Sequence, residues 1–185
     1  MQARKSFFCA VVLTVVAIAI PHLLFADHEE RRNRQRERHR DGDHRAGDLK
    51  PVNNPAYKEQ CGACHFTYQP ELLPSASWKK ILDQLEDHFG ESFELDPESQ
   101  KAVLAYLETN GAERSTAKRA VRIMRSLGSS TPVRITEIPL FRDKHRKVSA
   151  SVLNRPSISS LSNCTACHRR AEEGNYDDDS VVIPE

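Results

Sequence analysis

Three stretches of the chain carry apolar residues at every third or fourth position, the spacing of one helix face. The first lies between Pro74 and Phe89, and its apolar stripe consists of Trp78, Ile81, Leu82 and Leu85. The second starts at Asp96-Pro97-Glu98, with proline in the first turn, and ends near Gly111. The third runs from Ser115 to a stop at Gly128.

Alternation of apolar and polar residues, the pattern of a half-buried strand, is weak throughout. Only Val133 to Ile138, within the loop from Ser129 to Pro139, favours a short extended piece. We therefore predict a mainly α fold with short helices, long loops and little or no β-sheet.

The longest apolar run follows Arg4 and Lys5 and extends from Phe7 to Ile20. Pro21 and His22 interrupt it, and Ala26 precedes the first polar stretch. This order is typical of a secretory signal, here residues 1–26. The alternative is an uncleaved anchor, because residues 7–25 approach the roughly 20 apolar residues that span a bilayer. Both interpretations place the remainder outside the cytoplasm, and we expect a periplasmic protein.

Residues 27–50 contain eight Lys or Arg and seven Asp or Glu. So charged a segment is expected to be a disordered linker. Six arginines lie between Arg31 and Arg40, so contact with an anionic membrane surface or partner is an alternative to a solvated linker.

The mean hydropathy of −0.60 predicts a thin protein core for a chain of 185 residues. A thin core commonly requires a disulfide, a metal or a large apolar cofactor. Of the five cysteines, Cys9 lies inside the predicted signal. The other four are Cys61, Cys64, Cys164 and Cys167.

Each of these pairs forms C-x-x-C-H, completed by His65 and by His168. Two thiols three positions apart can form thioethers with the two vinyl groups of one porphyrin, and the adjacent imidazole can bind the iron. A thioredoxin-like pair would need a βαβ context, and zinc pairs usually lie about 15–20 residues apart. Four disulfide-bonded cysteines would leave both histidines unexplained. The motifs therefore predict two covalently bound haem c groups.

The second axial ligand of each iron is sought among the remaining histidines and Met124. His28, His39 and His44 lie in the charged segment and are expected to be solvated. His88 continues the apolar stripe of the first helix, and His145 lies in a basic stretch. Elimination favours these two, and their equal sequence spacing favours pairing His65 with His88 and His145 with His168.

Two alternatives remain open at this point. The histidine pairing could be exchanged, because sequence distance is a weak guide to spatial distance. Met124 could replace one histidine and raise the reduction potential of that haem, although its position on an amphipathic helix favours a core role.

An iron bound by two imidazoles has no open position for a substrate, and it lacks the thioether ligand that raises the potential. We therefore predict a low-potential electron shuttle and not an enzyme. The alternative is a dihaem enzyme of the peroxidase type, which needs one open haem position.

Charge is divided between two predicted haem regions, 51–112 and 113–185. Residues 58–108 have a net charge of −6 from four basic and ten acidic residues, and residues 113–147 have +7 from ten basic and three acidic. The tail, residues 172–185, carries six acids and no base. Charged faces can serve solubility alone, or they can steer a basic partner to the first region and an acidic one to the second.

Residues 57–184 resemble the small dihaem cytochrome c family often called DHC. The resemblance lies in Cys61-Gly-Ala-Cys-His65, in Trp78 followed by His88-Phe89-Gly90, in the stretch from Pro139 to His145, and in Cys164-Thr-Ala-Cys-His168. It implies two bis-histidine haems, with His88 and His145 as ligands. It also implies electron exchange with a membrane cytochrome b and with a small oxygen-binding monohaem cytochrome. The arginine-rich segment and the acidic end are less typical of the family.

Overall fold

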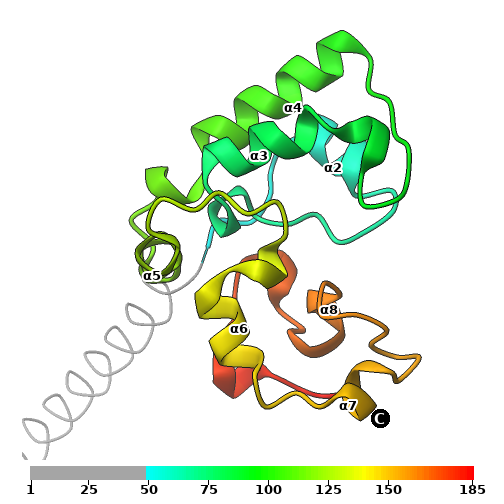
Figure 1. The fold of residues 1–185 in the computed structure, drawn as a ribbon, viewed down its shortest axis with the longest axis vertical. Coiled ribbons are helices and arrows are strands. Elements are labelled where there is room, and N and C mark those ends of the chain that lie inside the picture. Colours follow the sequence, from blue (N-terminus) through cyan, green and yellow to red (C-terminus); the bar gives the residue numbers. More distant parts are fainter. Residues whose placement is uncertain (1–48) are drawn as a thin grey trace, which may run out of the picture. The chain divides into compact units, whose positions relative to one another are not determined.

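A computed structural model describes residues 49–185, and this part of the chain belongs to one compact unit (Figure 1). It contains seven α-helices and no β-strand. The helices are α2 Pro55–Cys61, α3 Ser75–Leu82, α4 Pro97–Thr109, α5 Lys118–Leu127, α6 Pro139–His145, α7 Ala150–Leu153 and α8 Cys164–Cys167. Single 3-10 turns lie between the helices at Pro70–Leu72, Leu85–Asp87, Ala112–Arg114 and Ile135–Glu137, and two more follow α8 at Ala171–Glu173 and Asp178–Ser180. The predicted mainly α fold is confirmed.

Helix α4 forms where its local sequence predicts it. The Asp96 carboxylate accepts hydrogen bonds from the backbone N–H groups of Glu98 and Ser99, and Pro97 occupies the first helical position. Helix α5 ends at Gly128, whose φ of +58° suits glycine.

Two local expectations differ from the structure. The stripe between Pro74 and Phe89 is divided, because α3 ends at Leu82 and a 3-10 turn follows at Leu85–Asp87. The extended piece expected at Val133 to Ile138 is wrong, because this segment contains the 3-10 turn Ile135–Glu137. A strand is stabilised by pairing with a neighbour, and the described residues contain only two isolated β-bridges.

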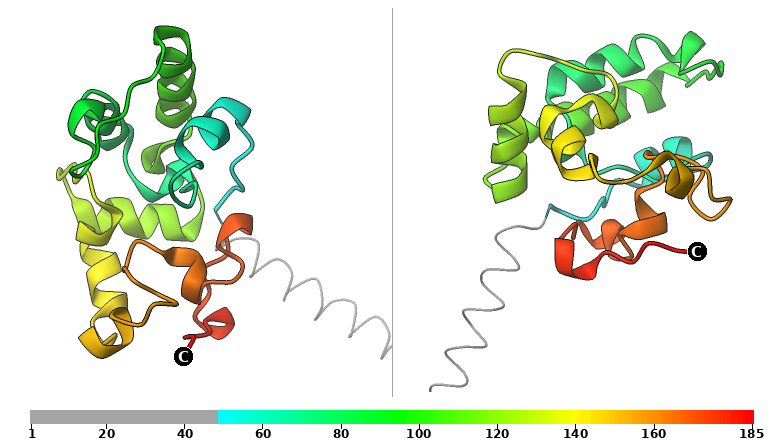
Figure 2. Two further views of the ribbon diagram at one scale, coloured as in Figure 1. Left: turned by 90° about the vertical axis from the view of Figure 1, so that its right-hand side faces the viewer. Right: turned by 60° about the horizontal axis from the view of Figure 1, so that its bottom comes forward.

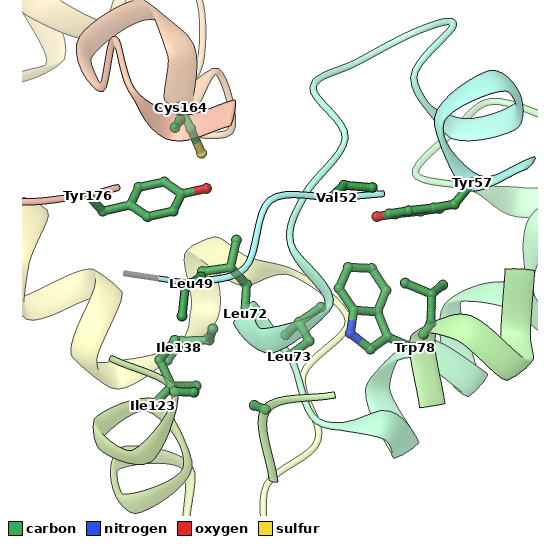
Figure 3. Packing of buried hydrophobic residues seen from close by; sticks show 14 of the residues in the cluster. Leu49, Val52, Tyr57, Leu72, Leu73, Trp78, Ile123, Ile138, Cys164 and Tyr176 are labelled. Carbon is green, nitrogen blue, oxygen red and sulfur yellow. The ribbon is translucent and has the colours of Figure 1, made fainter. Parts of the chain in front are cut away.

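The described residues bury one continuous apolar cluster. Helices α3 and α4 pack against each other through Trp78, Leu82, Val103 and Leu107, with Tyr57 of α2 beside them. Leu72 and Leu73 belong to the same cluster, which also contains Ile123 and Ile138. Figure 3 shows Tyr57 and Trp78 on one side of this centre, and Tyr176 and Cys164 on the other. The core therefore joins the parts of the chain that carry the two motifs.

The two motifs belong to two groups of helices within this unit. In Figure 1, α2, α3 and α4 lie together at one end, while α6, α7 and α8 lie at the other. The first view of Figure 2 shows the same division. The predicted boundary between residues 112 and 113 stays a prediction.

The first described residue is Leu49, which is buried and donates its backbone N–H to the carbonyl of Gly174. Gly174 has a φ of +81°, and a Cβ there would collide with the Leu49 carbonyl. The predicted signal and residues 27–48 of the predicted linker lie outside the described residues. Within residues 49–185, no helix is long and apolar enough to cross a membrane.

Candidate haem-binding sites

The first motif begins at the end of helix α2. Asn54 caps the helix by accepting the N–H of Tyr57, and Cys61 is the last helical residue. The chain then turns, so that Cys64 and His65 are exposed, while Cys61 is half-buried. The Nδ1 atom of His65 lies 2.8 Å from the carbonyl of Phe66. This bond favours Nδ1 as the donor and leaves Nε2 for a metal.

His88 faces His65 from a tight turn. The N–H of His88 donates to the Glu91 carbonyl at 2.7 Å, and Phe89 and Gly90 between them have φ values of +60° and +98°. A positive φ is unusual for phenylalanine and marks a constrained turn. The imidazole rings of His65 and His88 have centroids 6.1 Å apart and planes inclined by 21°.

The second motif forms the short helix α8, followed by His168. The N–H of His168 donates to the Cys164 carbonyl at 2.8 Å, which closes the turn that carries both cysteines. The C-terminal segment pairs with this turn, since Val182 donates its N–H to the Cys167 carbonyl at 2.9 Å. Cys164 is buried and Cys167 is half-buried, whereas the corresponding Cys61 and Cys64 are half-buried and exposed.

His145 reaches the second motif from the last residue of α6. Its Nδ1 lies 2.9 Å from the Phe141 carbonyl, and its ring stacks on the Phe141 ring at 4.0 Å. The rings of His145 and His168 have centroids 6.0 Å apart and planes inclined by 67°. The buried Nδ1 of His168 has no hydrogen-bond partner.

Both histidine pairs have the separation that an iron between them requires. An imidazole nitrogen binds a transition metal at about 2 Å, so two imidazoles on opposite sides of one metal have centroids about 6 Å apart. The observed 6.1 and 6.0 Å match this value. The structure thus brings together the histidines that the sequence interpretation paired.

A cavity adjoins the second motif. Cys164, Cys167, His145 and His168 all line it. Most of the other lining residues are apolar, including Leu140, Phe141, Val148, Val152, Ile158 and Val181.

Charged groups gather at this cavity. The Arg119 guanidinium donates to the Tyr176 carbonyl at 2.8 Å, while its buried Nε has no hydrogen-bond partner. Lys144 pairs with Asp178 at 2.7 Å. The pKa of His168 is lowered by burial, then by His145 and Arg119. At the first site the pKa of His88 is lowered by burial, then by His65 and Arg134.

Cysteine thiols of both motifs have raised pKa values, whereas catalytic cysteines have lowered ones. Burial raises the pKa of Cys61 to about 11 and that of Cys164 to about 12. Reactive cysteines have lowered pKa values in electropositive surroundings, whereas these lie in apolar ones. Such surroundings suit thioether bonds to an apolar porphyrin better than a thioredoxin-like redox pair.

Met124 is half-buried on α5 and packs against the core, and it is not among the residues that line the cavity. His28, His39 and His44 lie outside the described residues. Sequence reasoning missed the aromatic neighbours of the histidines, which are Tyr68 at His65, Phe141 at His145 and Tyr176 at His168. Phe141 could have been found from its position four residues before His145 on one helix face.

The helical fold, the two C-x-x-C-H turns and the facing imidazoles define a c-type cytochrome with two haem sites. A model of the family described as dihaem cytochrome c matches residues 57–176, and the chain belongs to this family. It accordingly carries two covalently bound haem c groups with iron, and it is a haem electron-transfer protein. The family resemblance of the sequence is confirmed.

Solved structures agree with this assignment. A diheme cytochrome c from Rhodobacter sphaeroides is 40% identical, with a TM-score of 0.61, and the match covers 69% of this chain and 100% of that one. The diheme cytochrome c sb-DHC from Shewanella baltica OS155 is 32% identical, with a TM-score of 0.58, and the match covers 71% and 93%. DHC purified from Rhodobacter sphaeroides is 35% identical, with a TM-score of 0.54, and the match covers 68% and 99%. No curated protein matches the chain.

Proposed function

We propose that this protein is an exported, low-potential electron shuttle in which both haems have two histidine ligands. His65 and His88 hold the first iron, and His145 and His168 hold the second. The observation that carries the proposal is the pair of imidazole separations, 6.1 and 6.0 Å, which suit a metal between each pair.

The protein contributes ligation, orientation and exclusion of water. Each haem supplies an iron that alternates between the ferric and ferrous states. The carbonyls of Phe66 and Phe141 orient His65 and His145 through their Nδ1 atoms. With imidazole on both faces, neither iron retains an open position, so electron transfer is favoured over the peroxidase-type alternative.

The optical and EPR spectra of the purified holoprotein test this assignment. We expect two low-spin ferric haems per chain and no spectral change when carbon monoxide is added to the reduced protein. The two EPR signals should differ in anisotropy, since the ligand planes are inclined by 21° at one site and 67° at the other. A high-spin signal or bound carbon monoxide at either haem would favour the enzyme.

Export is part of the proposal and rests on residues 1–26. Haem attachment at C-x-x-C-H motifs suits a chain that receives its haems after export. The mass of the mature protein from a periplasmic fraction tests it. Cleavage after Ala26 is expected, and a full-length chain in the membrane fraction would indicate the anchor.

We further propose redox proteins as partners, with a membrane cytochrome b and a small oxygen-binding monohaem cytochrome as candidates from the family resemblance. The exposed acidic residues near the first site suit a basic partner. They are Asp83, Glu86, Asp87, Glu91 and Glu94. Electron transfer to each haem, measured separately against ionic strength, tests the steering, and rates independent of salt at both haems would contradict it.

A further inference from the structure

One tyrosine touches both haem-binding sites. The Tyr68 ring packs against the ring of His65, with centroids 5.3 Å apart and planes inclined by 32°. Its hydroxyl donates to the backbone carbonyl of Ser162 at 2.8 Å, across 94 residues of sequence. Ser162 lies two residues before Cys164. The same side chain therefore connects an axial histidine of the first site with the loop that enters the second motif.

The contact continues to the attachment point of the second haem. The Ser162 carbonyl also lies 3.6 Å from the Cys164 sulfur, a free thiol that stands in for the thioether sulfur of the loaded protein. The path from the His65 imidazole to that sulfur crosses contacts of 5.3, 2.8 and 3.6 Å and the width of the phenol ring. The imidazole and the sulfur therefore lie within about 15 Å of each other.

Tyr68 is held firmly in this position. Its backbone carbonyl accepts the Tyr57 hydroxyl at 3.0 Å. Its neighbour Gln69 is fully buried and donates to the Ala171 carbonyl at 2.6 Å. The Gln69 amide oxygen accepts the Tyr176 hydroxyl at 2.5 Å, and the Tyr176 ring contacts that of His168 at 5.4 Å. A fully satisfied buried network of this kind specifies one arrangement.

We propose that Tyr68 couples the two haems, because its ring and hydroxyl provide the contact path along which they exchange electrons. The step moves one electron from the ferrous iron of one haem to the ferric iron of the other, and no bond or proton changes. Tunnelling decays more slowly through bonded and hydrogen-bonded groups than across an empty gap, which is why this path matters. The inference rests on the proposed two-haem shuttle function.

The test compares Y68F, which removes only the hydroxyl, with Y68L, which removes the ring as well. Y106F is the matched control, since Tyr106 is a half-buried tyrosine that packs on Tyr57. Pulse radiolysis at low dose delivers at most one electron to each holoprotein molecule. Re-equilibration between the haems is then followed optically, and a dilution series separates exchange within a molecule from exchange between molecules.

We expect the intramolecular exchange rate to fall about threefold in Y68F and about tenfold or more in Y68L, while Y106F keeps the original rate. Optical spectra and haem content should stay unchanged in Y68F, which separates coupling from a purely structural role. If Y68L fails to load haem, Y68F alone decides the outcome. Unchanged exchange in Y68F with two intact low-spin haems would overturn the coupling and indicate direct transfer between haem edges. Absence of two low-spin haems in the unmodified protein would instead overturn the proposed function.

Discussion

The two sites share a motif and differ in their surroundings. At the first site Cys64, His65 and Phe89 are exposed, and the two imidazole planes are nearly parallel. At the second site Cys164 is buried, a cavity adjoins the motif, and the planes are steeply inclined. The same five-residue signature thus lies in an exposed turn at one site and beside an apolar cavity at the other.

The difference separates two properties that an electron-transfer protein needs. An exposed site can approach a partner, whereas a site beside an apolar cavity is governed more strongly by the surrounding protein. Burial and charged neighbours are among the means by which proteins tune a haem. We therefore expect partner exchange to occur at the first site and the potential of the second site to respond more strongly to mutation.

The largest effect is expected when one of the two histidines outside the C-x-x-C-H motifs, His88 or His145, is replaced. H145A should convert only the second haem to the high-spin state, and H88A only the first. Each variant should then bind one equivalent of carbon monoxide per chain. Optical titration and EPR measure both. Added imidazole should restore the low-spin state faster in H88A, because that site is more exposed. Two low-spin haems in either variant would contradict the ligand assignment.

The next largest effect is expected from replacing one glycine near each site, because the two replacements should lower the free energy of unfolding by different amounts. G174A should destabilise the holoprotein by about 3 kcal/mol, because its φ is positive and the new Cβ collides with Leu49. Gly90, near the first site, also has a positive φ, but no atom lies within 4 Å of a Cβ placed there. G90A is therefore expected to lower the stability by about 1 kcal/mol. Denaturant unfolding measures both, and equal losses would show that the Leu49 contact relaxes.

The Arg119 cation should raise the potential of the second haem specifically. Reduction adds an electron to the iron, so removing a neighbouring positive charge disfavours the ferrous state. R119Q should lower that potential by an amount equivalent to about a tenfold change in the equilibrium constant, or about 59 mV for one electron. Spectroelectrochemistry resolves the two haems, with the exposed Arg122 replaced as R122Q for comparison. Equal shifts at both haems would contradict a local effect.

The smallest effect is expected for the exposed ion pair beside the second site. A hydrogen bond from Lys144 lowers the pKa of Asp178 below its usual value, so the carboxylate adds stability above that value and loses it as the pH falls through the folded pKa. With side chains 39% and 74% exposed, the pair should contribute about 0.2–1 kcal/mol. D178N should melt slightly below the original protein at neutral pH and equally in acid. A difference that persists in acid would indicate a packing effect.

Local signals predicted part of this molecule well. Helix α4 follows from an N-terminal cap, a proline and an apolar stripe, all within its own residues. The divided helix at Leu82 and the 3-10 turn at Ile135–Glu137 were missed, because tertiary contacts override local preference there. Elimination among the histidines predicts His88 and His145 as the further ligands, and this argument needs no knowledge of their positions in space.

The sequence by itself determined the covalent chemistry, since each C-x-x-C-H motif places two thiols and an imidazole within one turn. Only the tertiary structure decided which histidines face each other, which site adjoins an apolar cavity, and that Tyr68 reaches Ser162. The Tyr68 and Tyr176 hydrogen bonds join residues 94 and 107 positions apart. Contacts of that range arise from the packing of the whole unit, because no local pattern records which distant backbone a side chain will meet.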